Sequence, residues 1–310
     1  MVRDGNTALL TTRGTSLPAP FTREITAVKG SREPFHARMV PYYDHTDHHA
    51  FTPARIGVPA TSLTNWPDEY IHGTGDDLEN IDATQLERNA VVAAGVALYF
   101  AGLKDEDAPA LGAYSAARGR SRIAADLATA IAHVAEAAPA DREAAYGRAR
   151  NLVRETHRKE AATQASLRRM GPPGRAADSR ASGLEDSMKR DFDALERAYT
   201  ATTGKTPPNL DLTAEERAMA AKVFVPAGDV GAFADAVEKA KPVAGLHAMM
   251  RFEVLNFADG KRSAYEVYEA VAAEALSAGE WYYGRVKAAD VLETLQRAAQ
   301  AGAFTEKGAK

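Results

Sequence analysis

The spacing of apolar residues changes near residue 84. Before that point, short apolar or β-branched stretches such as "TALLTT", "REITAV" and "VPATSL" lie between Gly, Pro and Asp turns. Such a pattern is typical of strands joined by loops. We therefore predict strands and loops over residues 1–83.

Residues 84–103, "TQLERNAVVAAGVALYFAGL", follow a helical pattern instead. Apolar side chains recur there at the spacing of one helix face, at Leu86, Ala90, Val91, Ala94, Ala97 and Leu98. We predict a long, well-buried helix with Asp82 or Thr84 near its N-cap. This helix is expected to close a first unit over residues 1–104.

Residues 105–206 are rich in Ala, Arg and Glu and predict three helices. These are "SRIAADLATAIAHVAEAA", "DREAAYGRARNLVRETHRKEAATQASLRRM" and "LEDSMKRDFDALERAYTATTG". Pro139 and the "GPPG" at 171–174 separate them, because proline interrupts a helix. A helical hairpin or bundle is expected, with the charge runs on solvated faces.

Residues 207–310 form the last predicted unit. Thr213, followed three residues later by Glu216, is the capping box of a helix start. The end of the chain is predicted to alternate a helix, a Gly-flanked aromatic strand "EWYYGRV" at 280–286, a helix and a short terminal strand. That order is winged-helix-like. The predicted fold class is therefore a partial α/β region followed by a mainly α region that ends in a winged-helix-like unit.

Charge and hydropathy disfavour nucleic acid and membranes as binding partners of the chain. The chain has 38 basic and 42 acidic residues, a net charge of -4, so it has no global positive field to hold nucleic acid. The winged-helix-like unit has no basic face either, which favours a structural or pairing module over a DNA reader. No window approaches 18 uncharged apolar residues, and the segment after Met1 lacks the apolar core of a signal peptide. Neither a membrane partner nor a particular location is predicted.

The absence of cysteine changes the candidate chemistry. It excludes disulfides, thiolate zinc sites and a cysteine nucleophile, and leaves His, Asp and Glu as the good metal ligands. Four of the eight histidines fall within residues 42–82. His45, His48 and His49 would share one face of a helix, but prolines on both sides favour a strand end and a short helix, which disfavours a self-contained metal site. The histidines predicted to be core or boundary residues are His133, His157 and His247.

Two segments, "HTDHHAFTPARIGVPATSL" and "WPDEYIHGTGDDLENID", occur in this order. Together they resemble the C-terminal part of the catalytic domain of the co-catalytic zinc aminopeptidases, the family of bacterial leucyl aminopeptidases and glutamate carboxypeptidase-like enzymes. The resemblance covers residues 1 to about 103. The matching positions are Thr46, Asp47, His48 and Phe51, then Gly57, Val58, Pro59 and Ala60, then Tyr70, His72 and Asp76 or Asp77.

This resemblance implies an α/β phosphorylase/hydrolase-like zinc peptidase domain with two zinc ions in its complete site. It makes His72 the zinc ligand and Asp47 and His48 groups that brace the surrounding loops. Asp77, and less directly Asp76, would hold the loop that aims His72. The sequence departs from the family at Gly73, where Thr or Ser is usual. That departure is expected to loosen the loop.

The family's other metal ligands and its general base have no counterpart in the right order. The family needs an H-x-D pair, a consecutive Glu-Glu and one more carboxylate before the segment that carries these motifs. His45 and Asp47 have the H-x-D spacing but lie inside the later motif, and Glu215-Glu216 comes too late and is predicted to be part of a helix cap. The chain is therefore expected to begin just beyond the missing ligands, through truncation or as a natural remnant.

The predicted function is that of the C-terminal portion of a zinc-dependent aminopeptidase-like hydrolase, inactive by itself. Its expected partners are a peptide substrate in the complete enzyme and either a missing N-terminal half or a second copy. The alternative is a non-catalytic helical and winged-helix interaction module with a vestigial peptidase segment. In either case residues 1–83 lack part of their packing partners, whereas residues 105–310 are expected to fold independently.

Overall fold

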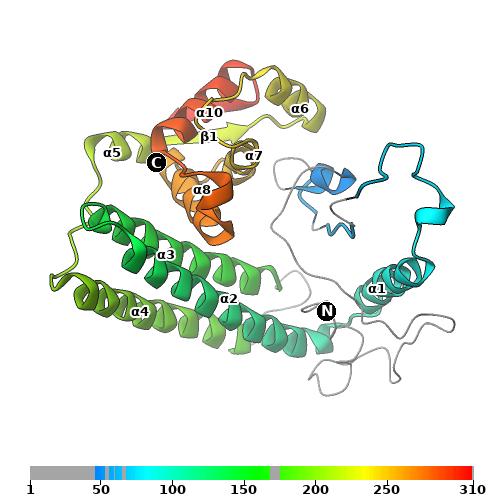
Figure 1. Cartoon of the computed structure of the whole chain (residues 1–310), viewed down its shortest axis with the longest axis horizontal. Helices are drawn as coiled ribbons and strands as arrows, with labels where there is room; N and C mark the ends of the chain where they lie inside the picture. Colours follow the sequence, from blue (N-terminus) through cyan, green and yellow to red (C-terminus); the bar gives the residue numbers. More distant parts are fainter. Residues whose placement is uncertain (1–45, 53–55, 59, 65–67, 168–174, 309–310) are drawn as a thin grey trace.

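The structure is a computed structural model that describes residues 46–52, 56–58, 60–64, 68–167 and 175–308 (Figure 1). Its first part contains two short 3₁₀-helices, η1 (Asp47–Phe51) and η2 (Leu78–Asn80), and the helix α1 (Ala83–Ala101). After the turn η3 (Asp105–Asp107) come three long helices, α2 (Ala108–Glu136), α3 (Arg142–Ser166) and α4 (Arg175–Thr203). The last part comprises α5 (Ala214–Ala220), β1 (Lys222–Pro226), α6 (Val230–Lys239), α7 (Ala248–Phe257), α8 (Ala264–Ala278), α9 (Glu280–Tyr283), α10 (Ala288–Gln300) and β2 (Phe304–Gly308).

The predicted helix at 84–103 is confirmed as α1, and Asp82 is its N-cap. The Asp82 carboxylate accepts hydrogen bonds from the backbone N–H groups of Thr84 at 2.8 Å and Gln85 at 3.1 Å. The prediction that this helix is well buried is wrong, because Gly95 is the one residue of α1 classed as buried. Helical spacing shows which side chains share a face, but it does not show whether another element covers that face.

The strand predicted from "VPATSL" is not present. Val58 and residues 60–63 lie in irregular backbone, and the described part of 46–82 contains turns and 3₁₀-helices without a strand. The strands predicted from "TALLTT" and "REITAV" lie outside the described residues. An α/β sheet in the first unit therefore stays a prediction.

The predicted helical bundle is confirmed in α2, α3 and α4, which pack side by side (Figure 1). Pro139 lies in the connection between α2 and α3, as predicted, whereas the "GPPG" segment lies outside the described residues. Helix α2 begins well before the predicted residue 121, with Pro109 in its first turn, where proline is favoured. The buried apolar centre of the bundle consists of Ala130, Val134, Tyr146, Ala149, Leu152, Val153, Leu195 and Tyr199.

The last part has its own apolar core around the antiparallel pair of β1 and β2. Phe224 of β1 pairs in register with Glu306 of β2, and the rings of Phe224 and Phe233 contact Phe304 edge to face. Strand β1 lies near the start of this part and β2 lies at its end, so their pairing joins the two ends of the last part. The predicted terminal strand is confirmed as β2, and Thr213 and Glu216 form the predicted capping box of α5.

The strand predicted at 280–286 is wrong, because residues 280–283 form the short helix α9. Gly279 and Gly284 have positive φ angles of 125° and 73° and turn the chain at both ends of the segment. The N–H of Gly284 donates to the carbonyl of Glu280 at 2.9 Å and closes the helical turn. The winged-helix fold, which depended on this strand, is not shown.

The bundle and the last part meet where α3 packs against α8. Ala273 and Leu276 of α8 belong to the same buried cluster as the bundle core. The amide of Asn151 donates to the carbonyl of Glu269 at 2.7 Å, and the hydroxyl of Ser277 donates to Asp126 at 2.6 Å. The bundle and the last part thus share a continuous packed interior.

Within the described residues, no single helix has both the length and the apolar character of a membrane span. The pair Ala83–Ala101 and Asp105–Glu136 meets these criteria only when its two members are taken together, and they are bent by 109° at the break.

Candidate functional site

The candidate zinc ligand His72 lies in a turn that local hydrogen bonds build. The carboxylate of Asp68 accepts the backbone N–H groups of Tyr70 at 2.9 Å and Ile71 at 3.1 Å. The N–H of Gly73 then donates to the carbonyl of Tyr70 at 2.9 Å. His72 has a φ of 62°, in the left-handed region that residues other than glycine seldom occupy. The side chain is exposed on this turn.

Gly73, the position that departs from the aminopeptidase pattern, lies tightly against the same turn. A Cβ at position 73 would lie 3.1 Å from the carbonyl oxygen of Tyr70, and one at Gly75 would lie 3.0 Å from the Tyr70 ring. Glycine therefore permits a close approach at this position. The expectation that Gly73 loosens the loop stays a prediction.

Asp77, predicted to hold the loop, caps the 3₁₀-helix η2 that follows it. Its carboxylate accepts the N–H of Glu79 at 3.0 Å, and the side-chain amide of Asn80 reaches back to the carbonyl of Gly75 at 2.8 Å. Asp76 is exposed beside it. These contacts tie the chain after His72 into one local structure, and the role of Asp76 and Asp77 in aiming a ligand stays a prediction.

Asp47 and His48 lie at the start of η1. The hydroxyl of Thr46 lies within hydrogen-bond reach of His48 Nδ1 and donates to Ser62 Oγ at 3.2 Å. His49 Nδ1 lies 3.0 Å from the carbonyl of Thr46. Thr46 thus connects η1 to residue 62, and Asp47 is exposed in the first turn of η1. The bracing role of Asp47 and His48 stays a prediction, and His45 lies outside the described residues.

The described residues do not fit a zinc ion. A zinc site needs three or four protein ligands gathered around one point. Within the part of the chain that the structure describes, no three His, Asp or Glu side chains gather in this way. His72 is therefore at most one ligand of a site that needs others.

The three histidines predicted to be core or boundary residues each form a hydrogen bond or ion pair within the protein. His157 is buried, and its Nε2 pairs with Asp191 at 2.8 Å. His133 Nε2 accepts a hydrogen bond from Arg148 at 3.1 Å, and burial, then the charges of Arg148 and Arg285, lower its pKa. His247 Nδ1 caps α7 by accepting the N–H of Met249 at 3.1 Å.

Buried polar residues on α3 are a feature that sequence reasoning missed. Thr156, His157, Glu160 and Gln164 are all buried and recur at the spacing of one helix face. Glu160 pairs with Arg122, Thr156 donates to Asp126, and Gln164 donates to Ser115. The helical spacing of these four residues could have indicated a buried polar face. The sequence analysis instead interpreted the charged residues of this helix as a solvent-exposed face.

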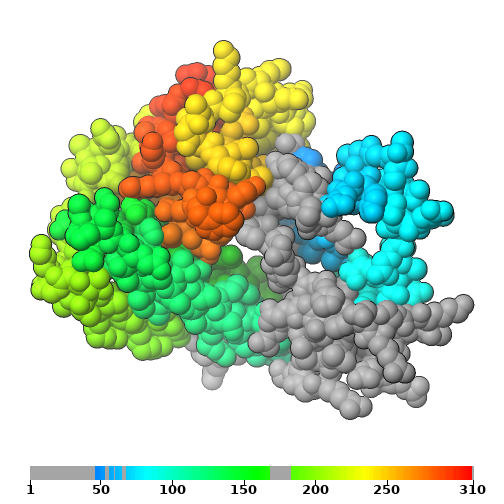
Figure 2. All heavy atoms as spheres, viewed as in Figure 1, coloured from blue at the N-terminus to red at the C-terminus, as the bar shows by residue number. Residues whose placement is uncertain are grey.

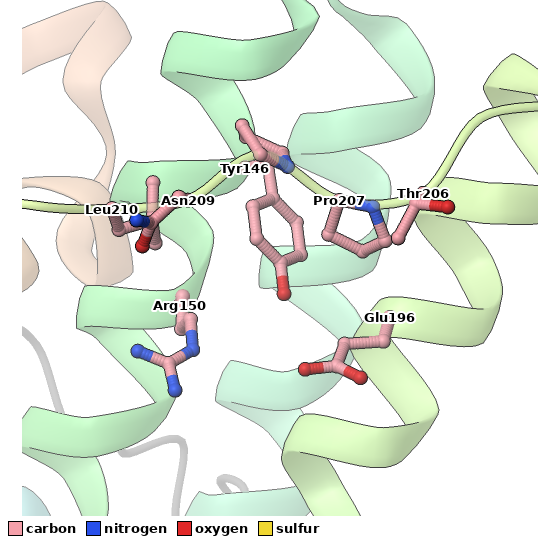
Figure 3. Close-up of a pocket in the computed structure, with 8 residues that line it drawn as sticks. Tyr146, Arg150, Glu196, Thr206, Pro207, Asn209 and Leu210 are labelled. Atoms are coloured by element: carbon pink, nitrogen blue, oxygen red, sulfur yellow. The ribbon is translucent and has the colours of Figure 1, made fainter.

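A polar cavity of about 290 Å³ lies where the segment after α4 crosses α3 and α4. Tyr146 stands between Arg150 and Glu196, and Thr206, Pro207, Asn209 and Leu210 cross above them (Figure 3). Pro208 also lines the cavity. Burial, followed by the charge of Glu196, raises the pKa of Tyr146. The cation–π contact of Arg150 with Phe192, 4.5 Å from the ring centroid, already engages this guanidinium. The cavity lies on the bundle and includes none of the residues predicted from the aminopeptidase motifs.

Comparison with protein families gives one match. Residues 1–97 match the model of Peptidase family M28. The matched range contains His72 and all the motif residues around it, and it ends within α1. No curated protein and no solved structure shows significant similarity to the chain. The family match covers less than a third of the chain, and residues 98–310 lie outside it.

Proposed function

We propose that residues 1–97 are the C-terminal portion of a zinc-dependent aminopeptidase-like domain, in which His72 supplies one metal ligand. The observation that carries this proposal is the match of these residues to Peptidase family M28, which supports a peptidase and hydrolase family for the segment. The position of His72 on an exposed turn, with Asp77 capping the next element, is compatible with a ligand-bearing loop.

Peptide hydrolysis of this kind needs a metal-bound water, a base that takes its proton and a group that stabilises the oxyanion. The described residues supply one histidine and no gathered set of ligands. The remaining ligands and the base would come from residues outside the described part. In the sequence, no H-x-D pair, Glu-Glu and further carboxylate stand in the family's order before the motifs around His72. For this reason we expect the 310-residue chain to be catalytically inactive by itself, and we derive no catalytic step for it.

The reading frame upstream of the Met1 codon provides the test. An in-frame H-x-D, Glu-Glu and Asp in that order would define a longer chain that hydrolyses aminoacyl-p-nitroanilides with zinc. In that chain, His72→Ala should lower kcat/KM at least about 100-fold, as expected for loss of a metal ligand, whereas His49→Ala should not. Full activity of the His72→Ala form would refute the role of His72. An upstream stop codon followed by a ribosome-binding site would favour a non-catalytic protein.

The alternative is a non-catalytic interaction module, and one observation favours it. All buried apolar core residues of the described chain lie between Ile123 and Phe304, beyond the family match. A fragment of residues 105–310 that unfolds cooperatively at the same temperature as the full chain would show that this part is self-sufficient. A fragment that aggregates or lacks a cooperative transition would argue against an independent module.

A further inference from the structure

The polar cavity between α3, α4 and the segment after α4 has a buried phenol in its wall. Tyr146 is 2% exposed, and its ring packs against that of Tyr199 on α4 with the two centroids 4.9 Å apart. Its hydroxyl points between the guanidinium of Arg150 and the carboxylate of Glu196 (Figure 3). A positive group, a hydroxyl and a negative group therefore line one cavity of about 290 Å³.

Helix geometry keeps the two charged groups apart. Arg150 follows Tyr146 by four residues on α3, so both side chains lie on one face of that helix. The guanidinium carbon of Arg150 lies 4.5 Å from the ring centroid of Phe192, which precedes Glu196 by four residues on α4. Arg150 is thus level with Phe192, and Glu196 is offset from it by one helical turn, roughly 6 Å.

Neither charge is neutralised within the described part of the chain. The interaction that the structure gives Arg150 is its cation–π contact with Phe192. That contact uses the flat face of the guanidinium, whereas its N–H donors project from the edge. Glu196 is exposed, and its nearby charge adds to the effect of burial in raising the pKa of Tyr146. Both charged groups are therefore available to a ligand.

The segment 206–210 forms a preformed wall of the cavity. Leu210 lies against Gly147 of α3, where a Cβ would be 3.5 Å from Leu210 Cδ2. Pro207 and Pro208 stiffen the backbone before it, because their rings fix φ. The prolines and Leu210 also bring apolar surface to a cavity that is otherwise polar. Such a wall suits a small apolar group.

We propose that this cavity binds the zwitterion of a small apolar α-amino acid, with the ligand carboxylate on Arg150 and the ligand ammonium on Glu196. The edge of a guanidinium matches a carboxylate in shape and charge, and a carboxylate accepts hydrogen bonds from an ammonium group. A ligand with a single charge would leave Arg150 or Glu196 without a partner in the cavity. The volume is close to the lower limit of ligand pockets, about 300 Å³, which suits a ligand of this size.

The proposed site is separate from the aminopeptidase motifs. In Figure 2, the yellow-green end of α4 lies at the left edge of the molecule, on the opposite side from the cyan surface that includes α1. The residues that line the cavity also lie outside the family match at 1–97. The proposal does not depend on zinc or on His72, so EDTA and His72→Ala should leave amino-acid binding unchanged.

Saturation-transfer NMR on the full chain, with L-alanine as the probe, tests the class of ligand. Binding is expected with a Kd on the order of millimolar, because the ligand has few atoms. N-acetyl-L-alanine lacks the ammonium and L-alaninamide lacks the carboxylate, so each should bind at least about tenfold more weakly. No binding of L-alanine at concentrations well above millimolar, or equal binding of the three compounds, would overturn the proposal.

Substitutions at the two charged residues test the location of the site. Glu196→Gln and Arg150→Gln each remove one charge, and each should raise the Kd for L-alanine at least about tenfold. Glu196 is exposed, so the fold of its variant should survive, as circular dichroism can verify. The control Glu185→Gln, at an exposed position of the same helix, should leave the Kd unchanged. Binding that neither Glu196→Gln nor Arg150→Gln weakens would place the ligand elsewhere and refute the proposal.

Discussion

Arg122 and Glu160 form a bidentate pair between α2 and α3. Arg122 Nε donates to Glu160 Oε1 at 2.7 Å and Nη2 donates to Oε2 at 2.8 Å. Glu160 is 2% exposed, whereas the Arg122 side chain keeps 43% of its surface in solvent. The hydrogen bond to Glu160 raises the pKa of Arg122. A buried carboxylate is tolerated at this position because Arg122 neutralises it.

Removal of the arginine should therefore destabilise the bundle. Arg122→Met leaves the buried Glu160 carboxylate without its partner and should lower the free energy of unfolding by about 2–3 kcal/mol, with allowance for the exposure of Arg122. Arg120→Met, at an exposed position of the same helix, should change it by less than about 0.5 kcal/mol. Urea unfolding followed by circular dichroism measures both. Equal stability of the two variants would show that the pair contributes nothing.

Gly119 makes room for the same carboxylate. A Cβ at position 119 would lie 2.5 Å from Glu160 Oε2, closer than real Cβ contacts come. Gly119→Ala should therefore destabilise the bundle by about 1–3 kcal/mol, in spite of the higher helix propensity of alanine. A Cβ at Gly183, in α4, would meet no side chain of the described residues within 4 Å, so Gly183→Ala should stabilise the chain by up to about 1 kcal/mol. Thermal unfolding of the two variants should shift in opposite directions.

Glu253 on α7 should make stability depend on pH. Burial first, then the charge of Glu274, raises the pKa of Glu253 from 4.5 to about 8, while Asn256 and Lys159 oppose the shift. The folded state thus holds a proton that the unfolded state releases. The stabilisation that this proton gives the folded state is complete below about pH 4.5 and is lost as the pH rises through about 8.

Glu253→Gln should abolish most of this dependence. The variant should be more stable than the parent chain at pH 8, by about 2 kcal/mol, because the glutamine has no charge to bury. Glu215→Gln, at an exposed position of α5, should keep the slope of the parent chain. Urea titrations across this pH range measure the unfolding free energies of the parent chain and both variants. Parallel curves for the parent and the Glu253→Gln variant would refute the raised pKa of Glu253.

Hydrogen exchange should separate the first part from the rest. The backbone hydrogen bonds of residues 68–82 are local, and the residues around them are exposed. Their amides should exchange much faster than those of α3 and α8, which line the packed interior. Strong protection throughout 56–82 in a proven monomer would contradict the expectation that this segment lacks packing partners.

The helical elements could be predicted from sequence because their signals are local. Asp82, Thr213 and Pro139 mark helix starts and breaks through hydrogen bonds or geometry within a few residues. The aromatic segment 280–286 was misassigned because its composition favours strands. The positive φ angles of Gly279 and Gly284 dictate a tight helical turn instead.

What could not be predicted depends on long-range packing. The spacing of Leu86 and Leu98 identified a helix correctly, but both side chains are exposed, because whether another element covers them is a tertiary property. Glu160 lies inside the bundle because Arg122 meets it from another helix, 38 residues away in sequence. At the candidate site, the motifs pointed to His72 as a candidate ligand, and the local turn around it does not bring further candidate ligands together.

The most direct test of the proposed function is a hydrolysis assay on the purified 310-residue chain. With aminoacyl-p-nitroanilides and added zinc, we predict no rate above the buffer control, and no difference between the parent chain and His72→Ala. A robust zinc-dependent rate that His72→Ala abolishes would show that the chain contains a complete metal site, and it would contradict the proposal that His72 is one ligand of an incomplete site.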